Sequence, residues 1–270
     1  MPTEKPKIVP LTPEGRLQQA IEEMNLTSFR VTLRDIPGID INWRDQKHSW
    51  ETFLHSACSL DRVQIIALLL AHPSIDVNQK DKFGTTPFMI ACSMGHTASV
   101  RLLLKDSRLR VNEPDKNGHT PLKRVAYNGH LDIIRWWIAS GREMDLGKPG
   151  DVEKSDAIAG AKKYGKTDVV TLLERFKENP EETRHAVRLD LGLVDELAAE
   201  MFALVVFVSD GLLRIKDTIS TPAARFFSIA RRLPLEIQML LCYRVEGSPK
   251  EIIPGKKSEV AFKELARRLW

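Results

Sequence analysis

The chain has 270 residues, of which 43% are apolar and 28% are charged, so it is long enough and apolar enough to bury the cores of two domains. Its net charge of +4 is spread along the sequence without a run of five like charges, which argues against nucleic acid and anionic membranes as partners. The first residues lack the basic region and apolar core of a secretory signal, so we expect a cytoplasmic location, with the nucleus as an alternative.

The amino terminus is rich in proline. Prolines at positions 2, 6, 10 and 13 predict a disordered tail over residues 1–13. A helical segment follows from Leu17 to Leu33, and after it Asp40-Ile41-Asn42 matches Asp76-Val77-Asn78. This match predicts that residues 17–33 form a first, atypical unit in phase with repeated units downstream.

The middle of the chain repeats a phrase at a fixed spacing. GTTPFMIACSMGH begins at Gly84, and GHTPLKRVAYNGH begins 34 residues later at Gly118. Thr52, Thr86 and Thr120 follow the same spacing, and each precedes a short helical segment and then an apolar run. A fixed period in this range is typical of a solenoid.

These phrases resemble the ankyrin repeat, which has a turn glycine, a Thr-Pro-Leu step, small residues, a Gly-His pair and a closing apolar run. The resemblance implies an all-α solenoid of helix-turn-helix repeats with β-turn fingers, which binds other macromolecules and does no chemistry. We expect about five units within residues 14–178, of which three are clear, at 47–80, 81–114 and 115–147. The last unit, from Ala157, has lost its Thr-Pro step, as expected where one side of a terminal repeat meets water.

The residues of the phrase have structural tasks of their own. Gly84 and Gly118 fall where the finger turn favours a positive φ, and each Thr-Pro step supplies a hydroxyl cap and a proline at the start of a helix. The unit at 47–80 departs from the pattern, with Trp50 at the turn-glycine position, Lys47 at the usual aspartate, and a finger about two residues longer. We expect that finger to be displaced or reshaped.

The repeat period stops beyond about Lys177, and residues 179–270 are predicted to form a separate helical domain. Residues from Val194 to Leu213 are apolar on almost every face, which is typical of a core helix. Its apolar stretch Met201–Val208 is too short to cross a bilayer. The partner helices are expected at Pro222–Arg232 with Thr221 as cap, at Leu235–Arg244, and at Ser258–Leu269 with Ser258 as cap.

Within this domain, RRLPLEIQMLLCYR from Arg231 resembles the opening of an F-box, in which a Leu-Pro pair starts a helix with an acidic residue and spaced aliphatics. The resemblance implies docking onto the adaptor of a cullin-type ubiquitin ligase. The alternative is plain core packing, which would bury the aliphatic side chains, whereas docking requires an exposed apolar face after Pro234. The residues that carry the resemblance are Leu233, Pro234, Glu236, Ile237, Leu240 and Leu241.

Other motifs point away from chemistry. Gly160–Thr167 fits the P-loop pattern, but its place in the repeat predicts a helix over Ala157–Tyr164 where a nucleotide site needs a strand and a loop. His55, His96 and His130 occupy repeated slots whose rings bond backbone groups, and no Cys/His set has zinc spacing. The three cysteines are expected to be buried and reduced. We therefore expect no enzymatic activity, no catalytic residue, no cofactor and no metal.

Ankyrin arrays present their finger tips and the exposed side of their first helices to partners. Removing the scaffold positions leaves variable residues, among which Phe83, Met94, Arg124 and Tyr127 are of types enriched in interface cores. The candidate partner-binding residues are His48, Glu51, Lys82, Phe83, Met94, Asn117, His119, Arg124 and Tyr127.

The sequence therefore predicts a monomeric protein-interaction module that binds a partner protein through the finger tips and the concave helix face. The alternative is a substrate receptor of a cullin-type ubiquitin ligase, with residues 233–243 on the adaptor. A weaker alternative is a scaffold that self-associates through its tail. Trp43 and Trp50 beside the irregular finger either anchor a partner or pack, and Trp136 and Trp137 are expected to pack.

Overall fold

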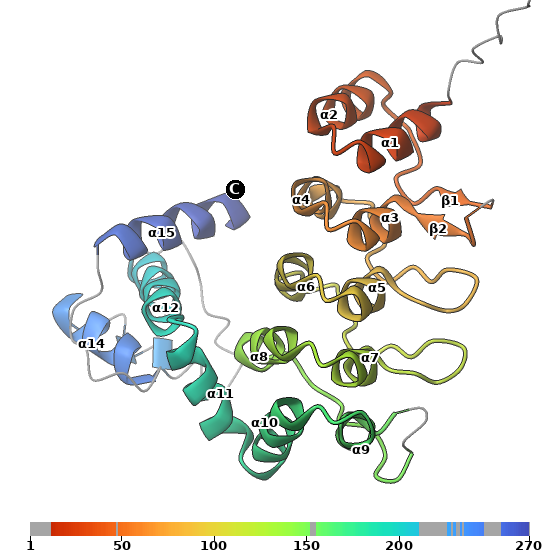
Figure 1. The fold of residues 1–270 in the computed structure, drawn as a ribbon. Helices are drawn as coiled ribbons and strands as arrows, with labels where there is room; N and C mark the ends of the chain where they lie inside the picture. The colour runs from red at the N-terminus through yellow and green to blue at the C-terminus, as the bar shows by residue number, and fades with distance from the viewer. Residues whose placement is uncertain are drawn as a thin grey trace, which may run out of the picture. The chain divides into compact units, whose positions relative to one another are not determined.

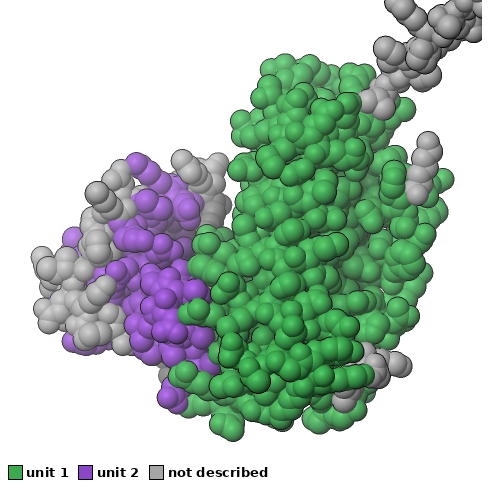
Figure 2. Space-filling view, in the orientation of Figure 1, with its two compact units in different colours: residues 1–180 green, residues 181–270 purple. Residues whose placement is uncertain are grey.

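The computed structural model describes residues 12–46, 48–151, 155–210, 226–227, 229–230, 233, 235–245 and 255–269. The chain divides into two compact units, residues 1–180 and residues 181–270 (Figure 2). The predicted tail lies outside the described residues up to position 11. Its last residue, Pro13, already begins the first helix, and the side chain of Thr12 caps that helix by accepting a hydrogen bond from the N–H of Gly15.

The first unit consists of helix pairs, numbered here as repeats 1 to 5 in chain order. In Figure 1 the first helices of the pairs stack in one column, the second helices stack in another, and the connecting loops project beyond the first helices. The all-α solenoid is confirmed. The helices are α1 (Pro13–Glu22) and α2 (Leu26–Asp35), α3 (Phe53–Ser59) and α4 (Val63–Ala71), α5 (Pro87–Met94) and α6 (Thr97–Leu104), α7 (Pro121–Asn128) and α8 (Leu131–Ser140), and α9 (Ala157–Lys163) and α10 (Thr167–Glu178).

The first helices of repeats 2, 3 and 4 begin as the sequence predicts. The hydroxyls of Thr52, Thr86 and Thr120 accept hydrogen bonds from the N–H three residues further on, at 3.4, 3.2 and 3.3 Å. In repeat 5 the carboxylate of Asp156 takes the place of the threonine and accepts from the N–H of Ala159 at 2.8 Å. A side-chain cap therefore survives the loss of the Thr-Pro step.

Asparagine side chains join successive repeats. The amide of Asn42 donates to the carbonyl oxygen of Ser74 at 2.7 Å, and its oxygen accepts from the N–H of Asp76 at 2.8 Å. Asn78 makes the equivalent pair of bonds to the next loop, and Asn112 makes one of them. These contacts join backbone groups of one loop to the asparagine of the preceding loop and so help to fix the register of the stack.

The repeated histidines are structural, as predicted. His55 is fully buried, and its Nε2 lies 3.0 Å from the carbonyl oxygen of Thr85 in the next repeat. The rings of His96 and His130 contact carbonyl oxygens of the preceding repeat at 3.0 and 3.2 Å. Burial lowers the pKa of His55, so this ring is neutral in the folded protein at neutral pH.

The two tryptophans of repeat 4 differ in burial. Trp137 is fully buried and meets Phe88 edge-on, with ring centroids 5.1 Å apart. Trp136 is partly buried, and the guanidinium of Arg101 lies 3.6 Å from its ring centroid. Both side chains pack within the array, which confirms the expectation.

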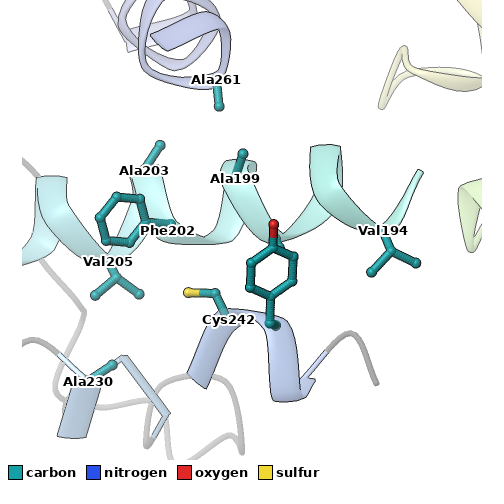
Figure 3. Packing of buried hydrophobic residues seen from close by; sticks show 10 residues of the cluster. Val194, Ala199, Phe202, Ala203, Val205, Ala230, Cys242 and Ala261 are labelled. Carbon is teal, nitrogen blue, oxygen red and sulfur yellow. The ribbon is translucent and has the colours of Figure 1, made fainter. Parts of the chain in front are cut away.

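The second unit is built around α12 (Val194–Ser209), which packs against both α14 (Leu235–Val245) and α15 (Gly255–Leu269). In Figure 3, Ala199 and Ala203 point from α12 toward Ala261 on α15, whereas Val205 points to the opposite side. Small side chains let the two helices approach closely. The buried cluster comprises Val194, Ala198, Ala199, Phe202, Ala203, Val205, Ala230, Cys242, Tyr243 and Ala261.

Some boundaries in the second unit differ from those predicted. A helix, α11 (Pro180–Asp190), occupies a segment for which none was predicted. α12 ends at Ser209, and α15 begins at Gly255, so Ser258 lies in its first turn rather than at its cap. The helix predicted at Pro222–Arg232 lies largely outside the described residues. The parts of it that are described, residues 226–227 and 229–230, are helical.

No helix in the described ranges combines the length and the apolar character needed to cross a membrane. Cys58, Cys92 and Cys242 are buried, and none of them forms a disulfide bond.

Candidate functional site

The loops before α3, α5 and α7 are called finger 2 (residues 45–51), finger 3 (81–85) and finger 4 (115–119). Fingers 3 and 4 share one design, because the buried carboxylates of Asp81 and Asp115 accept hydrogen bonds from the N–H groups two and four residues further on, at 2.7–2.9 Å. The turn glycines, Gly84 and Gly118, adopt the predicted positive φ of 81° and 83°. The finger tips are thereby held by groups at their base.

Finger 2 has a longer loop on an antiparallel pair, β1 (Arg44–Asp45) and β2 (Glu51–Thr52). Asp45 pairs with Glu51, as Asp81 pairs with Thr85 in finger 3. Residues 46–50 therefore replace residues 82–84, which confirms the longer finger. The predicted alignment of Lys47 with the finger aspartate is wrong, because the insertion moves that place to Asp45; Lys47 itself lies outside the described residues.

The two tryptophans beside finger 2 have different surroundings. Trp43 stacks on Phe53 with ring centroids 5.6 Å apart, so it packs. Trp50 is 42% exposed at the finger tip, where the guanidinium of Arg44 lies 5.1 Å from its ring centroid. Trp50 has φ +67°, a strained conformation for a bulky residue, and such strain is frequent at functional sites.

His48 and Glu51, both candidate residues, lie in finger 2 with opposite surroundings. His48 is exposed, and its Nδ1 lies 2.5 Å from the Asp45 carboxylate, which raises the pKa of the ring. Glu51 is partly buried, and burial followed by the negative charge of Asp81 raises the pKa of its carboxyl. The charges of Asp81 and His48 act on the pKa of Glu51 in opposite directions.

The finger tips form a continuous row. The N–H of Lys82 donates to the carbonyl oxygen of Ser49 at 2.8 Å, and the N–H of Lys116 donates to that of Phe83 at 3.0 Å. Phe83 is 54% exposed on this row, with the Lys82 ammonium 4.8 Å from its ring centroid. Met94 is 57% exposed but lies at the far end of α5.

Finger 4 holds its candidate residues by charge. One carboxylate oxygen of Asp115 lies 3.0 Å from Arg124 Nη2 and 3.0 Å from His119 Nδ1. Burial opposes ionisation of Asp115, but hydrogen bonds from the His119 N–H, from Arg124 and from the His119 ring outweigh it, so the pKa of this carboxyl lies below its ordinary value. Asn117 is exposed at the same tip. Arg124 is thus only partly free, since Asp115 fixes its guanidinium.

Tyr127 has a partner that the sequence did not suggest. It is 43% exposed, and its ring centroid lies 4.1 Å from that of Tyr164, which is equally exposed. Tyr164 precedes Gly165 as Met94 precedes Gly95, so a register comparison with repeat 5 would have found it. The aromatic surface of repeat 4 therefore continues onto repeat 5.

The structure divides the candidate residues into two groups. His48, Glu51, Lys82, Phe83, Asn117 and His119 lie on the fingers, with Arg124 reaching toward them. Met94 and Tyr127 lie at the carboxyl ends of α5 and α7, about 12 Å further along helices of eight residues at 1.5 Å per residue. A partner that touches both groups has to cross the full length of the first helices.

The F-box-like segment is partly exposed. Ile237 is 42% and Val245 is 54% exposed, and Leu241 between them is partly buried, so the three lie on one face at a spacing of four residues. On the other face Cys242 and Tyr243 are buried against α12. Pro234 and the side chains of Glu236 and Leu240 lie outside the described residues.

The residues of the P-loop pattern are divided between two helices. Gly160 lies inside α9, and Thr167 begins α10, so the glycine-rich loop of a phosphate site is not formed there. Among the described residues, no three His, Cys, Asp or Glu side chains are grouped closely enough to hold a metal ion.

Comparison with protein families assigns the array. Residues 17–113 and 54–148 match the model of the family described as ankyrin repeats in three copies. No curated protein sequence matches the chain. The helix pair α9 and α10 extends the array beyond the matched residues. Ankyrin repeats are protein-interaction modules, and the matched residues of this chain belong to the ankyrin-repeat family.

Proposed function

We propose that the protein is a non-enzymatic interaction module that binds one partner protein through the finger tips and the concave face of the first helices. The observation that carries the proposal is the set of large, exposed side chains along these elements. Apart from Trp50, which stands at the turn of finger 2, they occupy positions that the scaffold does not use for capping, turning or stacking. They are Trp50, Phe83, Met94, Tyr127 and Tyr164.

Burial energetics favour these side chains as the centre of an interface. Full burial of a large apolar side chain contributes about 1.5–3 kcal/mol, and a few aromatic or long apolar residues usually supply most of the affinity of an interface. Polar candidates on the fingers, namely His48, Glu51, Lys82, Asn117 and His119, would surround this centre and set orientation. Arg124, oriented by Asp115, is the charged group best prepared to meet a carboxylate.

The test is affinity capture from lysate with the full chain and with a triple variant, Phe83→Ala, Met94→Ala and Tyr127→Ala. All three residues are exposed, so the variant keeps the fold, which circular dichroism and thermal unfolding would verify. A matched control changes three equally apolar, exposed residues elsewhere, Val31, Leu189 and Val260, to alanine. The proposal is supported if a partner that binds the unmodified chain saturably is lost from the triple variant and retained by the control variant. Partners retained by the triple variant would exclude this surface.

A second function, substrate receptor of a cullin-type ubiquitin ligase, is favoured by the partly exposed apolar stripe of Ile237, Leu241 and Val245 on α14. In this version the array selects a target and the stripe meets the ligase adaptor. Purified adaptor and full chain would be mixed and analysed by calorimetry, with Ile237→Glu and Val245→Glu as the disrupting changes. Absence of heat with the unmodified chain would remove this alternative without affecting the interaction module.

A further inference from the structure

The tips of fingers 2, 3 and 4 project next to one another on the same side of the array (Figure 1). Backbone hydrogen bonds from Lys82 to Ser49 and from Lys116 to Phe83 join them. The side chain of Lys116 is placed by a further contact, because a Cβ atom on Gly84 would lie 2.8 Å from the backbone nitrogen of Lys116 and 3.0 Å from its Cγ. The aliphatic stem of Lys116 therefore packs against the tip of finger 3, at the residue that follows Phe83.

Two lysines accompany the exposed ring of Phe83. The Lys82 ammonium lies 4.8 Å from the ring centroid, and both Lys82 and Lys116 are exposed. Within the described part of the chain, no salt bridge reaches either lysine. Trp50 on finger 2 also has a cation beside its ring, the guanidinium of Arg44. The tips of fingers 2 and 3 thus each combine a cation with an exposed ring, and finger 4 adds a further cation.

The carboxylates of the same fingers are held by the protein itself. Asp81 and Asp115 are buried, and each accepts hydrogen bonds from two backbone N–H groups of its own finger. The side chain of Asp45 is only 15% exposed and lies 2.5 Å from the ring of His48. Glu51 is partly buried. Among the described residues of the three fingers, a partner can therefore reach the two ammonium groups more readily than any carboxylate.

The loop that leads into finger 4 also carries more cations than carboxylates. Glu113 on this loop contacts Lys80 at 2.9 Å and Arg110 at 3.5 Å. Hydrogen bonding to Lys80, followed by the charges of both cations, lowers the pKa of the Glu113 carboxyl. One carboxylate is thus shared by two cations, and Arg110 is exposed. The charge left over beside the finger tips is positive.

On the basis of the proposed function, we infer that the partner presents an acidic segment to the finger tips, with Asp or Glu side chains at Lys82 and Lys116 and an apolar side chain on Phe83. Neither lysine has to give up an existing ion pair on binding, so the new pairs form without that cost. The ring and the aliphatic lysine stems supply apolar area around the charges. Segments rich in Lys or Arg are rejected, because they bring like charges together.

The test selects ligands for the full chain from a library of random linear peptides displayed on phage. The expected result is enrichment of peptides that combine Asp or Glu with large apolar residues. A selected peptide is then titrated by fluorescence anisotropy against the double variant Lys82→Glu and Lys116→Glu, for which we expect the affinity to fall roughly tenfold. The same peptide with its acidic residues changed to lysine should bind this variant better than it binds the unmodified chain.

A matched control carries Lys105→Glu and Lys177→Glu, two exposed lysines outside the fingers, and changes the net charge by the same amount. It should leave the affinity unchanged. An equal loss in the control would overturn the inference, because the net charge of the protein would then explain the binding. An oligothymidylate that binds as tightly as the peptide and is lost from the finger variant would also overturn it, since the tips would then accept any polyanion.

Failure of this inference is distinguishable from failure of the proposed function. Selected peptides without acidic enrichment, lost from Phe83→Ala but retained by the finger variant, would overturn the acidic segment and leave the interaction surface standing. A library that yields no binder would likewise overturn the acidic segment. The proposed function itself is contradicted by a different result, namely that the triple variant at Phe83, Met94 and Tyr127 retains the partners captured from lysate.

Discussion

Finger 3 and finger 4 have the same backbone and different electrostatics. In both, a buried aspartate at the base accepts two backbone hydrogen bonds and a glycine turns the tip. Among the described residues, only Asp115 also has side-chain partners, an ion pair with Arg124 and a hydrogen bond with the His119 ring. The comparison teaches that the scaffold needs the carboxylate but not its counter-charge. The counter-charge comes from positions that we propose face a partner, so in finger 4 the proposed recognition residues also contribute to stability.

The largest expected effect tests this difference directly. Asp115→Ala removes the carboxylate that accepts from two backbone N–H groups and leaves Arg124 without its partner, and we expect a loss of about 3 kcal/mol in the free energy of unfolding. Asp81→Ala is the matched change in finger 3 and should cost roughly 2 kcal/mol or less, because it removes only the backbone bonds. Urea denaturation of both variants measures the two values. Equal losses would contradict the contrast between the fingers.

The Asp115 contribution should also depend on pH. Its pKa is depressed in the folded protein, so the ionised carboxylate stabilises the fold above the ordinary aspartate pKa of about 3.9. That stability is lost as the pH falls from this value through the folded pKa. The gap between the unmodified chain and Asp115→Ala should therefore narrow in acid.

Exchange of one position between the repeats is the next largest test. Arg124 and Ile90 are each the fourth residue after the capping threonine of their repeat. Arg124→Ile gives α7 the residue that α5 has at this position and should destabilise the protein by about 1.5 kcal/mol, because Asp115 keeps only the hydrogen bond with His119. Ile90→Arg offers Asp81 an arginine at the position that Arg124 holds relative to Asp115, and should stabilise the protein by about 0.5 kcal/mol. Thermal unfolding of the two single variants and of the double variant gives the coupling. If both single variants lose stability, the surroundings of the two positions, rather than the arginine–aspartate pair, decide the stability change.

A smaller effect is expected at Glu51, next to finger 3. Its raised folded pKa means that the folded state holds the proton more tightly, so stability declines as the pH rises through the window from the ordinary glutamate value to the folded pKa. Glu51→Gln should therefore gain about 0.5 kcal/mol at neutral pH and nothing in acid, where both side chains are uncharged. Glu23→Gln, at an exposed site on repeat 1, serves as the control and should show no such difference.

The smallest stability effect is expected at Trp50. Trp50→Gly relieves a positive φ, which should stabilise the protein by about 1–2 kcal/mol. It also loses the contact with Arg44 and increases the conformational entropy of the unfolded chain, each at a cost of about 0.5–1 kcal/mol, so the net effect should be close to zero. If Trp50 anchors the partner, affinity falls while the unfolding midpoint stays in place. Unchanged affinity would assign the residue to the finger alone.

The repeat array could be predicted closely because its information is local. The turn glycines, the capping threonines and the structural histidines act within one repeat or on its neighbour, so their spacing carries their roles. The insertion in finger 2 could be counted but not placed, because period counting aligned Lys47 with the finger aspartate whereas strand pairing puts Asp45 there. Pairing across a loop is a property of backbone hydrogen bonds, which the spacing of one phrase does not contain.

The candidate surface was predictable as a set of positions and less so as a set of contacts. The exposure of Phe83, Met94 and Tyr127 follows from the repeat pattern. The hydrogen bond between Arg124 and Asp115 joins residues nine positions apart, and the ring contact between Tyr127 and Tyr164 joins residues 37 positions apart. The sequence does not show which of these side chains turn toward each other. In the second unit, α11 was not predicted. Its residues are largely polar, so the sequence shows little apolar periodicity there.

The asparagine contacts between repeats have a consequence for mechanical load. Asn42, Asn78 and Asn112 each connect one loop with the next loop, and in the described part of the array no asparagine bond passes over a whole repeat. Tension applied along the stack would therefore break one boundary at a time, starting from an end, with a similar gain in length at each step. A protein of this construction can yield part of its length to a pulling force and still retain an intact central surface.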